Sequence, residues 1–370
     1  MYSSLLFGEI CTLVKDKVRV DDPAMKCIEL EHIESNAHKV TGFTSTNETK
    51  SQKTKFEKDD VLFGKCRPYL RKSWLATFDA ACSTEIWALR ANPRWIAPEF
   101  LHFIIQSERF SQHANITSGT KMPRADWKHV KEFPVTVPSL EEQRRIAGIL
   151  STWEKAINAY DRLIALKEKQ RAGIISMLID GDAVTGEIRS FGDLVMQHKE
   201  KTTENNQYPV LTSSRNGIML QSDYYSNGNV ASKDNTGYNV VPRGFFTYRH
   251  MSDDLVFKFN INNICDKGIV STLYPVFSAK EGVVNSHWLK LILNHGQDFM
   301  RYSAAQKQGG SRTYMYFKSL SKLKIRVPGI SYQNRVSDLI SVWDGEIKAL
   351  EKKRDLLKKQ KQGLMQQLLA

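Results

Sequence analysis

The sequence lacks any long apolar run. Within 370 residues, no stretch approaches the roughly 18 apolar residues that a membrane-spanning helix needs. The N-terminal residues, MYSSLLFGEICTLVKDK, contain an apolar stretch that is too short for a signal peptide and is interrupted by an acid. We therefore expect a soluble protein of the cytoplasm, without a membrane partner.

Cysteine is scarce, and no two cysteines have the spacing of a metal or redox motif. The five are Cys11, Cys27, Cys66, Cys82 and Cys265. Because they lie far apart and no C-x-x-C occurs, we predict reduced thiols, most of them buried. The nine histidines include no H-E-x-x-H and no tight grouping with acids. The sequence therefore predicts no metal site and no cofactor.

The motifs of the chemistry expected near nucleic acids are also missing. The chain has no N-P-P-[FY] or D-P-P-[FY], in which an amino-methyltransferase holds its target amine. It has no G-x-x-x-x-G-K-[ST] and no G-x-G-x-x-G for nucleotide phosphates. The acid pairs Asp59–Asp60 and Asp253–Asp254 are interpreted as turn or solvated acids rather than metal ligands. No catalytic residue is predicted.

Positive charge is abundant. Lys and Arg number 53 against 40 Asp and Glu, which gives a net charge of +13 and a pI near 9.4. Such an excess attracts polyanions, of which DNA and RNA are the commonest. The alternative is a basic protein that docks on an acidic partner. With 41% hydrophobic residues, the chain is long enough for two domains with cores of their own.

One segment occurs twice. The stretch VPSLEEQRRIAGILSTW begins at Val137, and VPGISYQNRVSDLISVW begins 190 residues later at Val327. Over the gapless overlay of 137–180 on 327–370, 13 of 44 positions are identical. A match of this length without gaps indicates duplication.

Both copies are predicted to form long helices. Ser139 followed by Glu142 is a capping-box pattern, whereas Ser331 in the second copy has no matching acid. A helix of about 40 residues spans roughly 60 Å, more than a small core requires. Apolar residues recur in steps of four and three, which is the seam of a coiled coil. The seam residues are Ile146, Leu150, Trp153, Ile157, Tyr160 and Ile164 in the first copy, and Val336, Ile340, Trp343, Ile347, Leu350, Leu357, Leu364 and Leu368 in the second.

Charged residues interrupt this seam at Lys167, Arg171, Arg354 and Lys361. Polar seam residues fix the register of two helices at some cost in stability. We therefore predict that the two helices pack on each other and hold two globular bodies at a set distance. The alternative is two unrelated amphipathic helices, each covering its own domain.

The segments between the helices are similar in organisation. Strand-like runs dominate DVLFGKCRPYLRKSWLATFDAACSTEIWALR in the first, and VVPRGFFTYRHMSDDLVFKFN and GIVSTLYPVF in the second. One helix is expected in WIAPEFLHFIIQSERF and another in SHWLKLILNHGQDFMRYSAAQ. A basic, glycine-containing loop and a strand then precede each long helix. The predicted fold is α+β, a tandem repeat with globular domains at 1–136 and 186–326 and long helices within 137–185 and 327–370.

Basic, hydroxyl and glycine residues gather in equivalent loops of both globular segments. Arg and Lys bind phosphates or guanine edges, and Ser, Thr and glycine N–H groups suit phosphate oxygens. As a set they form a candidate DNA face. In the first segment it comprises Lys65, Arg67, Tyr69, Arg71, Lys72, Ser118, Gly119, Thr120, Lys121 and Arg124; in the second it comprises Ser213, Ser214, Arg215, Tyr248, Arg249, Gly309, Gly310, Ser311, Arg312 and Tyr314.

The repeated helix openings closely resemble the conserved helices of specificity subunits of type I restriction–modification systems. The pattern P-x-x-x-x-Q-x-R followed by a tryptophan occurs in both copies. The likeness extends to DVLFGKCRPYLRK, ACSTEIWALR and DKGIVSTLYPVF, which look like segments of that family's target recognition domains. It covers nearly the whole chain. The second helix opening departs mildly, because ISYQNR stands in place of the acidic LEEQRR.

The resemblance implies a division of labour. Each target recognition domain reads one half of a split site in double-stranded DNA. An antiparallel helix pair sets the gap between the halves and docks two methyltransferase subunits, which restriction subunits that hydrolyse ATP then join. The residues expected to mark the docking helices are Gln143, Arg145, Trp153, Gln333, Arg335 and Trp343. A pseudo-twofold axis is expected to relate the two domains. The rival hypotheses are a nuclease acting alone and a coiled-coil adaptor that never contacts DNA.

Overall fold

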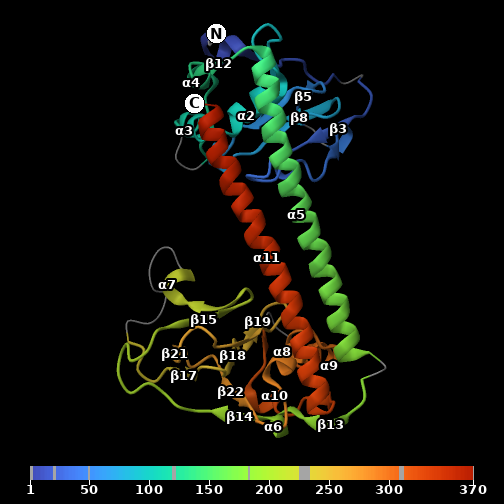
Figure 1. The fold of residues 1–370 in the computed structure, drawn as a ribbon, viewed down its shortest axis with the longest axis vertical. Helices are drawn as coiled ribbons and strands as arrows, with labels where there is room; N and C mark the ends of the chain where they lie inside the picture. The colour runs from blue at the N-terminus through green and yellow to red at the C-terminus, as the bar shows by residue number, and fades with distance from the viewer. Residues whose placement is uncertain are drawn as a thin grey trace. The chain divides into compact units, whose positions relative to one another are not determined.

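The chain forms two compact units, and each long helix is divided between them. In the computed structural model, residues 3–19, 22–48, 51–118, 122–181, 184–224, 234–307 and 312–369 are described. Unit 1 comprises Met1–Arg162 with Glu351–Ala370, and unit 2 comprises Leu163–Leu350. Each unit has a globular α+β part and part of both long helices (Figure 1). The predicted fold class, two similar α+β domains with two long helices, is confirmed.

Unit 1 contains two four-stranded sheets and two short ribbons. One sheet has the order β2-β9-β6-β7 and the other β4-β3-β8-β5, while β1 pairs with β12 and β10 with β11. The strands are β1 (Ser3–Leu6), β2 (Cys11–Leu13), β3 (Lys26–Ile28), β4 (Thr44–Ser45), β5 (Lys53–Phe56), β6 (Val61–Gly64), β7 (Ser73–Leu75), β8 (Ala80–Ser83), β9 (Ile86–Ala91), β10 (Thr117–Ser118), β11 (Arg124–Ala125) and β12 (Pro134–Val137).

Among the helices of unit 1, α2 lies against the first of these sheets. The helices are α1 (Phe7–Ile10), the 3-10 turns η1 (Leu30–His32), η2 (Thr46–Glu48) and η3 (Pro68–Leu70), then α2 (Pro98–Gln106), α3 (Glu108–Ala114), α4 (Trp127–Val130) and the long α5 (Leu140–Asp180). Phe7, Phe100 and Phe110 are buried in the core between α2, α3 and the sheet. The same core includes Ile146 and Leu150 of α5, so the long helix is packed directly on the globular part.

Unit 2 has one four-stranded sheet, in the order β14-β22-β18-β20, and four ribbons. Its strands are β13 (Glu187–Ser190), β14 (Val195–His198), β15 (Leu211–Ser214), β16 (Gly217–Leu220), β17 (Asn239–Pro242), β18 (Phe246–Tyr248), β19 (Met251–Ser252), β20 (Phe259–Ile261), β21 (Lys267–Val270), β22 (Val276–Ala279), β23 (Thr313–Tyr314) and β24 (Lys324–Val327). Its helices are α6 (Phe191–Leu194), α7 (Gln221–Tyr224), α8 (Ser286–His295), α9 (Gln297–Ala305), α10 (Phe317–Leu320) and the long α11 (Ile330–Leu368).

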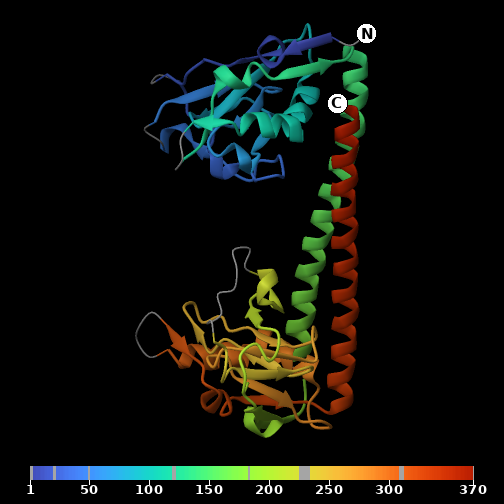
Figure 2. The same ribbon diagram turned by 90° about the vertical axis from the view of Figure 1, so that its left-hand side faces the viewer.

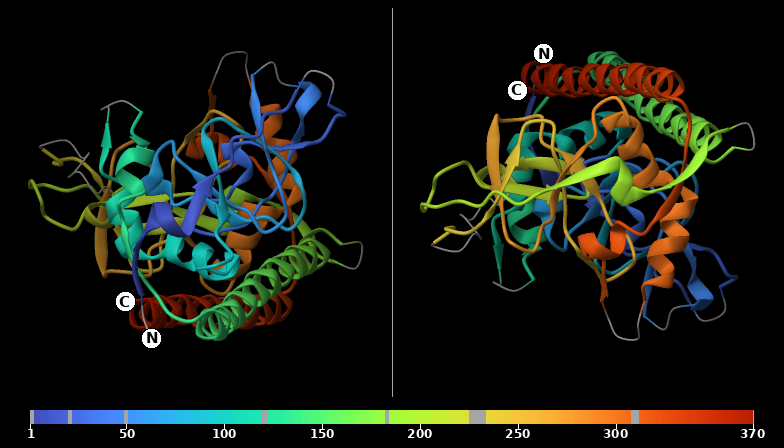
Figure 3. Two further views of the ribbon diagram at one scale, coloured as in Figure 1. Left: turned by 90° about the horizontal axis from the view of Figure 1, so that it is seen from above. Right: turned by 90° about the horizontal axis from the view of Figure 1, so that it is seen from below.

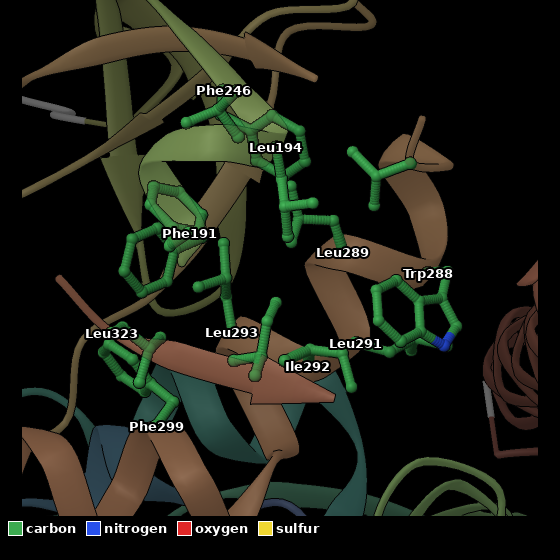
Figure 4. Packing of buried hydrophobic residues seen from close by; sticks show 14 of the residues in the cluster. Phe191, Leu194, Phe246, Trp288, Leu289, Leu291, Ile292, Leu293, Phe299 and Leu323 are labelled. Carbon is green, nitrogen blue, oxygen red and sulfur yellow. The ribbon is translucent and has the colours of Figure 1, made fainter. Parts of the chain in front are cut away.

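The core of unit 2 lies between its main sheet and α8. Phe191, Phe246 and Leu194 approach Leu289 and Leu293 of α8 in Figure 4. Burial of such large aromatic and aliphatic side chains is the principal favourable term in folding. Val336 and Ile340 of α11 belong to the same cluster, so the second long helix is also anchored in a globular core.

The two units share one topology, as the tandem repeat predicts. The sheet β2-β9-β6-β7 of unit 1 has the same connectivity as β14-β22-β18-β20 of unit 2. In each unit, a strand at the start pairs antiparallel with the strand before the long helix, β1 with β12 and β13 with β24. The globular part of each unit lies to one side of its helix pair (Figure 3). The units differ outside this shared sheet and strand pair. Unit 1 has a second four-stranded sheet, whereas the other strands of unit 2 form two-stranded ribbons.

In each unit, the single helix expected before the basic loop is divided into two helices, α2 and α3 in unit 1 and α8 and α9 in unit 2. The first breaks at Ser107, whose side chain caps α3 by accepting a hydrogen bond from the Phe110 N–H. The second breaks at Gly296, between α8 and α9. Both break residues have extended backbone angles, so the chain turns while its apolar periodicity continues. The periodicity alone predicted continuous helices, and that expectation was wrong.

The long helices follow their predicted apolar seam. Among the seam residues, Ile157, Ile164 and Ile347 are buried, and Trp153 and Trp343 are half-buried. The predicted cap also forms in part. The Ser139 hydroxyl accepts a hydrogen bond from the Glu142 N–H, whereas the Glu142 carboxylate binds Arg145 instead of closing the capping box. Ser331 lies inside the first turn of α11 and does not precede it.

All five cysteines are free thiols, and four of them are buried, as predicted. Burial raises the pKa of the Cys82 thiol to about 12, so the thiolate that reacts or binds metals is disfavoured there. Across the described ranges, no helix has the length and hydropathy to cross a membrane.

Candidate DNA interface and helical spacer

The charged residues that interrupt the apolar seam all form ion pairs with the other long helix. In unit 1, Lys361 bonds Glu154 at 2.6 Å and Arg354 contacts Asp161 at 3.4 Å. In unit 2, Lys167 bonds Glu346 at 2.8 Å and Arg171 bonds Asp344 at 2.5 Å. The first half of α5 therefore lies beside the second half of α11 in unit 1, and the reverse holds in unit 2 (Figure 2). The two helices run antiparallel.

Two of these ion pairs are copies of each other. Under the 190-residue repeat, Arg171 corresponds to Lys361 and Asp344 corresponds to Glu154. The pair Arg171–Asp344 in unit 2 is therefore the equivalent of Lys361–Glu154 in unit 1. Such pairs penalise any shift of register, because a shift would leave half-buried charges unpaired.

A buried glutamine joins each long helix to its globular part. Gln143 is fully buried, and its side chain accepts a hydrogen bond from the Ala97 N–H and donates to the carbonyls of Trp95 and Pro138. Its repeat partner Gln333 is also fully buried. The side-chain oxygen and nitrogen of Gln143 hold the loop before α2 against the first turn of α5. Those of Gln333 hold the loop before α8 against the first turn of α11.

Gln333 reproduces these contacts with other residues. It accepts from the Asn285 N–H and donates to the Pro328 carbonyl, each at 2.8 Å. The interpretation of Gln143 and Gln333 as partner-docking residues was therefore wrong, because fully buried amides with internal partners do not face another subunit. Their recurrence in both copies is explained by the internal junction.

The other residues assigned to partner docking lie nearer the surface. Arg145 and Arg335 are exposed, and Arg145 bonds Glu142 one turn earlier. Trp153 and Trp343 are half-buried. The Lys167 ammonium lies 4.7 Å from the centre of the Trp343 ring, a cation–π contact that orients the indole.

In unit 1, the backbone brings two basic loops together. The Arg67 N–H donates to the Pro123 carbonyl at 2.8 Å, and the Ala125 N–H donates to the Lys65 carbonyl at 2.9 Å. Arg67 has a φ of 52°, a left-handed conformation that these bonds hold in place. Lys65, Arg67 and Arg124 therefore lie on adjoining segments. Tyr69, in the turn that follows Arg67, is 53% exposed.

Two predicted basic residues of this unit point toward the protein instead. Arg71 donates to the Glu108 carboxylate at 2.7 Å and to the Gln106 carbonyl at 2.6 Å. Lys72 donates to the Leu30 carbonyl at 2.6 Å. Their charges attach the β6–β7 loop to α3 and η1, and their placement on the DNA face stays a prediction.

In unit 2, two predicted face residues lie inside the core. Tyr248 is fully buried and its hydroxyl donates to the Met315 carbonyl at 2.8 Å. Ser213 is buried and accepts a hydrogen bond from the Asn260 side chain at 2.9 Å. Neither side chain is available to DNA in this fold. Ser214 is half-buried and shapes the β15–β16 turn by donating to the Gly217 carbonyl.

The arginines of unit 2 do lie on the surface. Arg215 bonds Asp254 at 2.6 Å, and Arg312 bonds Asp253 at 2.9 Å. The Arg215 guanidinium holds the pKa of the Asp254 carboxyl below its usual range. Asp253 and Asp254 are thus partners of exposed arginines. Arg249 is exposed and has no side-chain partner among the residues that the structure describes.

The structure adds features that sequence reasoning missed. Tyr316, 55% exposed, stacks on Tyr314 with a ring-centre distance of 5.9 Å and on His250 at 5.0 Å. Exposed stacked aromatics offer flat surfaces to bases or sugars. A cleft of about 790 Å³ is lined by Arg215, Arg249 and Met251, and Met251 pairs with Tyr314 in the β19–β23 ribbon. The alternation Tyr-Met-Tyr at 314–316, in which Met315 is buried and both tyrosines are exposed, was the available signal.

Several face residues fall outside the described part of the chain. These are Gly119, Thr120 and Lys121 in the first loop and Gly309, Gly310 and Ser311 in the second, together with the side chain of Ser118. Among the residues that are described, no group of three His, Cys, Asp or Glu is placed to hold a metal ion.

These features define a class of protein: two α+β units of one topology, each with exposed arginines on loops and each anchored to an antiparallel helix pair. Known proteins share these features over part of the chain. Residues 21–168 match the type I restriction modification DNA specificity domain. By this domain and these relatives, the chain is similar to specificity subunits of type I restriction–modification systems.

The relatives are similar over part of their length. The chain is 31% identical over 168 residues to the type I restriction enzyme EcoDI specificity subunit of Escherichia coli, covering 42% of this chain and 37% of that protein. It is 22% identical over 289 residues to the MjaVIII specificity subunit of Methanocaldococcus jannaschii, covering 68% of this chain and 65% of that protein. The chain thus spans less than two thirds of the length of either relative.

Solved structures share the fold over the whole chain. One, described as the structural basis underlying complex assembly and conformational transition of the type I R-M system, has a TM-score of 0.62 at 16% identity, and covers 100% of this chain and 97% of that chain. Another, the S subunit of a type I restriction-modification system from M. genitalium, has a TM-score of 0.56 at 13% identity, and covers 100% and 96%.

Proposed function

We propose that the chain is the DNA-recognition subunit of a type I restriction–modification complex and catalyses no reaction itself. Each globular part reads one half of a bipartite site in double-stranded DNA. The helix pair sets the gap between the halves, with the two parts related by a pseudo-twofold axis. The protein acts in the cytoplasm, where its DNA target would be accessible.

The observation that carries this proposal is the specificity-domain match at residues 21–168, in a chain whose second unit repeats the topology of the first. A duplicated domain suits a target with two halves. The net charge of +13 and the exposed Arg67, Arg215 and Arg249 support binding to DNA phosphates or base edges.

The partners we propose are two methyltransferase subunits and, around them, restriction subunits that hydrolyse ATP. The long helices offer the docking surface. Arg145 and Arg335 are exposed in equivalent positions, and Leu339 and Val342 of α11 are 43% and 69% exposed. Exposed apolar side chains on a polar helix face are typical of protein interfaces.

Salt dependence of DNA binding separates this function from that of an adaptor without DNA contact. The full chain, alone or with its methyltransferases, is titrated with duplex DNA between 50 and 200 mM salt. Several neutralised phosphates should produce a fall in affinity of about 10³-fold or more. An adaptor would bind weakly at every salt concentration. Incubation of the chain alone with DNA and Mg²⁺ should leave the DNA intact, whereas cleavage would favour a nuclease.

Domain exchange tests the division of labour. Residues 186–326 are replaced by those of another specificity subunit, and methylated sites are sequenced in cells that carry the complete system. We expect new bases in one half of the site and unchanged bases in the other. The reciprocal exchange of residues 1–136 is the matched control and should alter the opposite half. New bases in both halves after a single exchange would contradict independent reading.

A further inference from the structure

A cavity in unit 2 gathers cations that have too few anionic partners. It has a volume of about 270 Å³ and lies between α8, β20 and the two long helices. Arg171 of α5, Lys258 before β20 and Lys290 of α8 all line it. The carboxylate of Asp344 lines it as well, but that carboxylate already bonds Arg171 at 2.5 Å.

The two lysines of this cavity are half-buried and unpaired. Within the described ranges, neither Lys258 nor Lys290 has a hydrogen-bond or ion-pair partner. Burial lowers the pKa of both ammonium groups, and the charge of Arg171 lowers that of Lys258 further. Burial also lowers the pKa of His295, at the end of α8, to about 4. Cations held together away from water cost free energy unless an anion joins them.

The walls of the cavity are fixed before any ligand binds. Asn294 of α8 accepts a hydrogen bond from the Phe259 N–H and donates to the Phe259 carbonyl, each at 2.9 Å. This clamp holds Lys258 beside α8. Asn260 donates to Ser213 and to the Ser214 carbonyl, each at 2.9 Å, which attaches the β15–β16 hairpin to β20. Preorganised donors bind an anion without the cost of ordering them.

The corresponding place in unit 1 has more carboxylates to offset its cations. Lys361, the repeat equivalent of Arg171, bonds both Glu154 and the Gln106 side chain. The cavity there, of about 650 Å³, is also lined by Glu34 and Asp161. The described lining of the unit 1 cavity thus includes three carboxylates, those of Glu34, Glu154 and Asp161, beside Lys39, Arg71, Lys358 and Lys361, whereas the described lining of the unit 2 cavity includes only the Asp344 carboxylate beside its four Lys and Arg residues. The excess of positive charge is therefore larger in unit 2.

We propose that the unit 2 cavity is a binding site for a phosphate group, held by the ammonium groups of Lys258 and Lys290. Lysine binds phosphate as a compact point charge, and two lysines match the charge of a phosphate dianion. The phosphate comes either from free inorganic phosphate or from the backbone of bound DNA. Only the second source rests on the proposed function.

The first arm of the test uses inorganic phosphate and the full chain at constant ionic strength. Calorimetric titration and thermal unfolding are compared for the wild type, Lys290→Met and Lys258→Met, with Lys358→Met from the unit 1 cavity as the matched control. Wild type and control should bind phosphate and unfold at a higher temperature in its presence. Each unit 2 variant should lose about tenfold or more in affinity. In phosphate-free buffer both variants should be as stable as the wild type or more stable, which separates loss of binding from misfolding.

The second arm measures duplex DNA affinity against salt for the same four proteins. If the ligand is a DNA phosphate, free phosphate has little effect, and each unit 2 variant binds DNA more weakly with a salt slope reduced by about 1. Lys358→Met should match the wild type. The proposal is overturned if neither phosphate nor DNA distinguishes the unit 2 variants from the control. Failure of the wild type to bind any DNA would instead contradict the proposed function. The phosphate titration would still show whether the cavity binds phosphate.

Discussion

Gln143 and Gln333 show how one side chain can join an α-helix to a globular domain. Each lies in the first turn of a long helix and satisfies backbone groups that would otherwise be buried without partners. A buried polar group without a hydrogen bond costs about 1–3 kcal/mol. A primary amide carries an acceptor oxygen and two N–H donors, so one side chain can accept from an N–H and donate to carbonyls at the same time. The repeat therefore preserves a structural residue at this position.

We predict that Gln143→Ala destabilises unit 1 by about 2–4 kcal/mol, because it leaves the Ala97 N–H and the Trp95 carbonyl unsatisfied. Denaturant unfolding measures the change. The neighbouring Arg144→Ala, at an exposed position, is the control and should stay within about 0.5 kcal/mol of the wild type. Unchanged stability with loss of methyltransferase binding would restore the docking interpretation of Gln143.

A second feature at this scale is a pair of buried histidines in unit 1. His102 is buried beside His38, with ring centres 5.9 Å apart, and its neighbours include the Ser73 hydroxyl and the Gln106 amide. Burial lowers the pKa of His102 to about 4, and Lys361 lowers it further while Glu154 raises it. The imidazole is therefore neutral in the folded protein at neutral pH.

The sign of the pH effect follows from this depressed pKa. Between about pH 6.5 and 4, the unfolded chain binds a proton at His102 that the folded chain does not. Stability is fully present above pH 6.5 and is lost as the pH falls toward 4, by an amount on the order of 3 kcal/mol. His102→Asn should flatten this part of the curve of unfolding free energy against pH, whereas the exposed control His287→Asn should not. Equal curves for wild type and His102→Asn would refute the assignment.

The candidate DNA face illustrates which residue properties the sequence could predict. Arg67 and Arg249 were identified by type and position, and they are exposed. Arg71 is used internally because Glu108 is 37 residues away in the chain but 2.7 Å away in the fold. Such long-range pairing leaves no local pattern, so residue type alone did not separate structural from surface arginines.

At the scale of elements, the long helices were the most predictable part of the fold. Their period, their seam and their charged interruptions are local properties of the sequence, and the partners of those charges lie on the other copy of the repeat. The breaks at Ser107 and Gly296 were not predicted, because the apolar face continues through them and only tertiary packing turns the chain.

The pair Lys361–Glu154 should specify the antiparallel register in unit 1. Its side chains are 12% and 29% exposed, so solvent screens it only in part. We predict that Lys361→Glu destabilises unit 1 by about 2–4 kcal/mol, and that adding Glu154→Lys recovers part of the loss, with a coupling energy of about 1–3 kcal/mol in a double-mutant cycle. The exposed pair Arg145–Glu142 on α5 is the control, with an expected coupling below about 0.5 kcal/mol. Additive effects at Lys361 and Glu154 would show that the contact does not determine register.

For the whole molecule, the proposed function links the length of the helices to the geometry of the target. Three of the four interhelical ion pairs follow one register. From one of these pairs to the next, the residue number on α5 rises by as much as the residue number on α11 falls. Residues 159–165 of α5 therefore lie opposite 350–356 of α11. This correspondence identifies a segment of both helices that can be removed without shifting the pairs on either side.

We predict that deleting 159–165 together with 350–356 shortens the gap in the DNA site and leaves the bases of both halves unchanged. The deletion removes one heptad from each helix and takes out Asp161 and Arg354 as a pair, so no charge loses its partner there. Seven residues at 1.5 Å each amount to about 10 Å, which is about three base pairs at 3.4 Å per pair. Duplicating the same two segments should lengthen the gap by a similar amount. Methylation profiling of the complete system measures the gap, and an unchanged gap with altered bases would show that the helices do not determine the spacing.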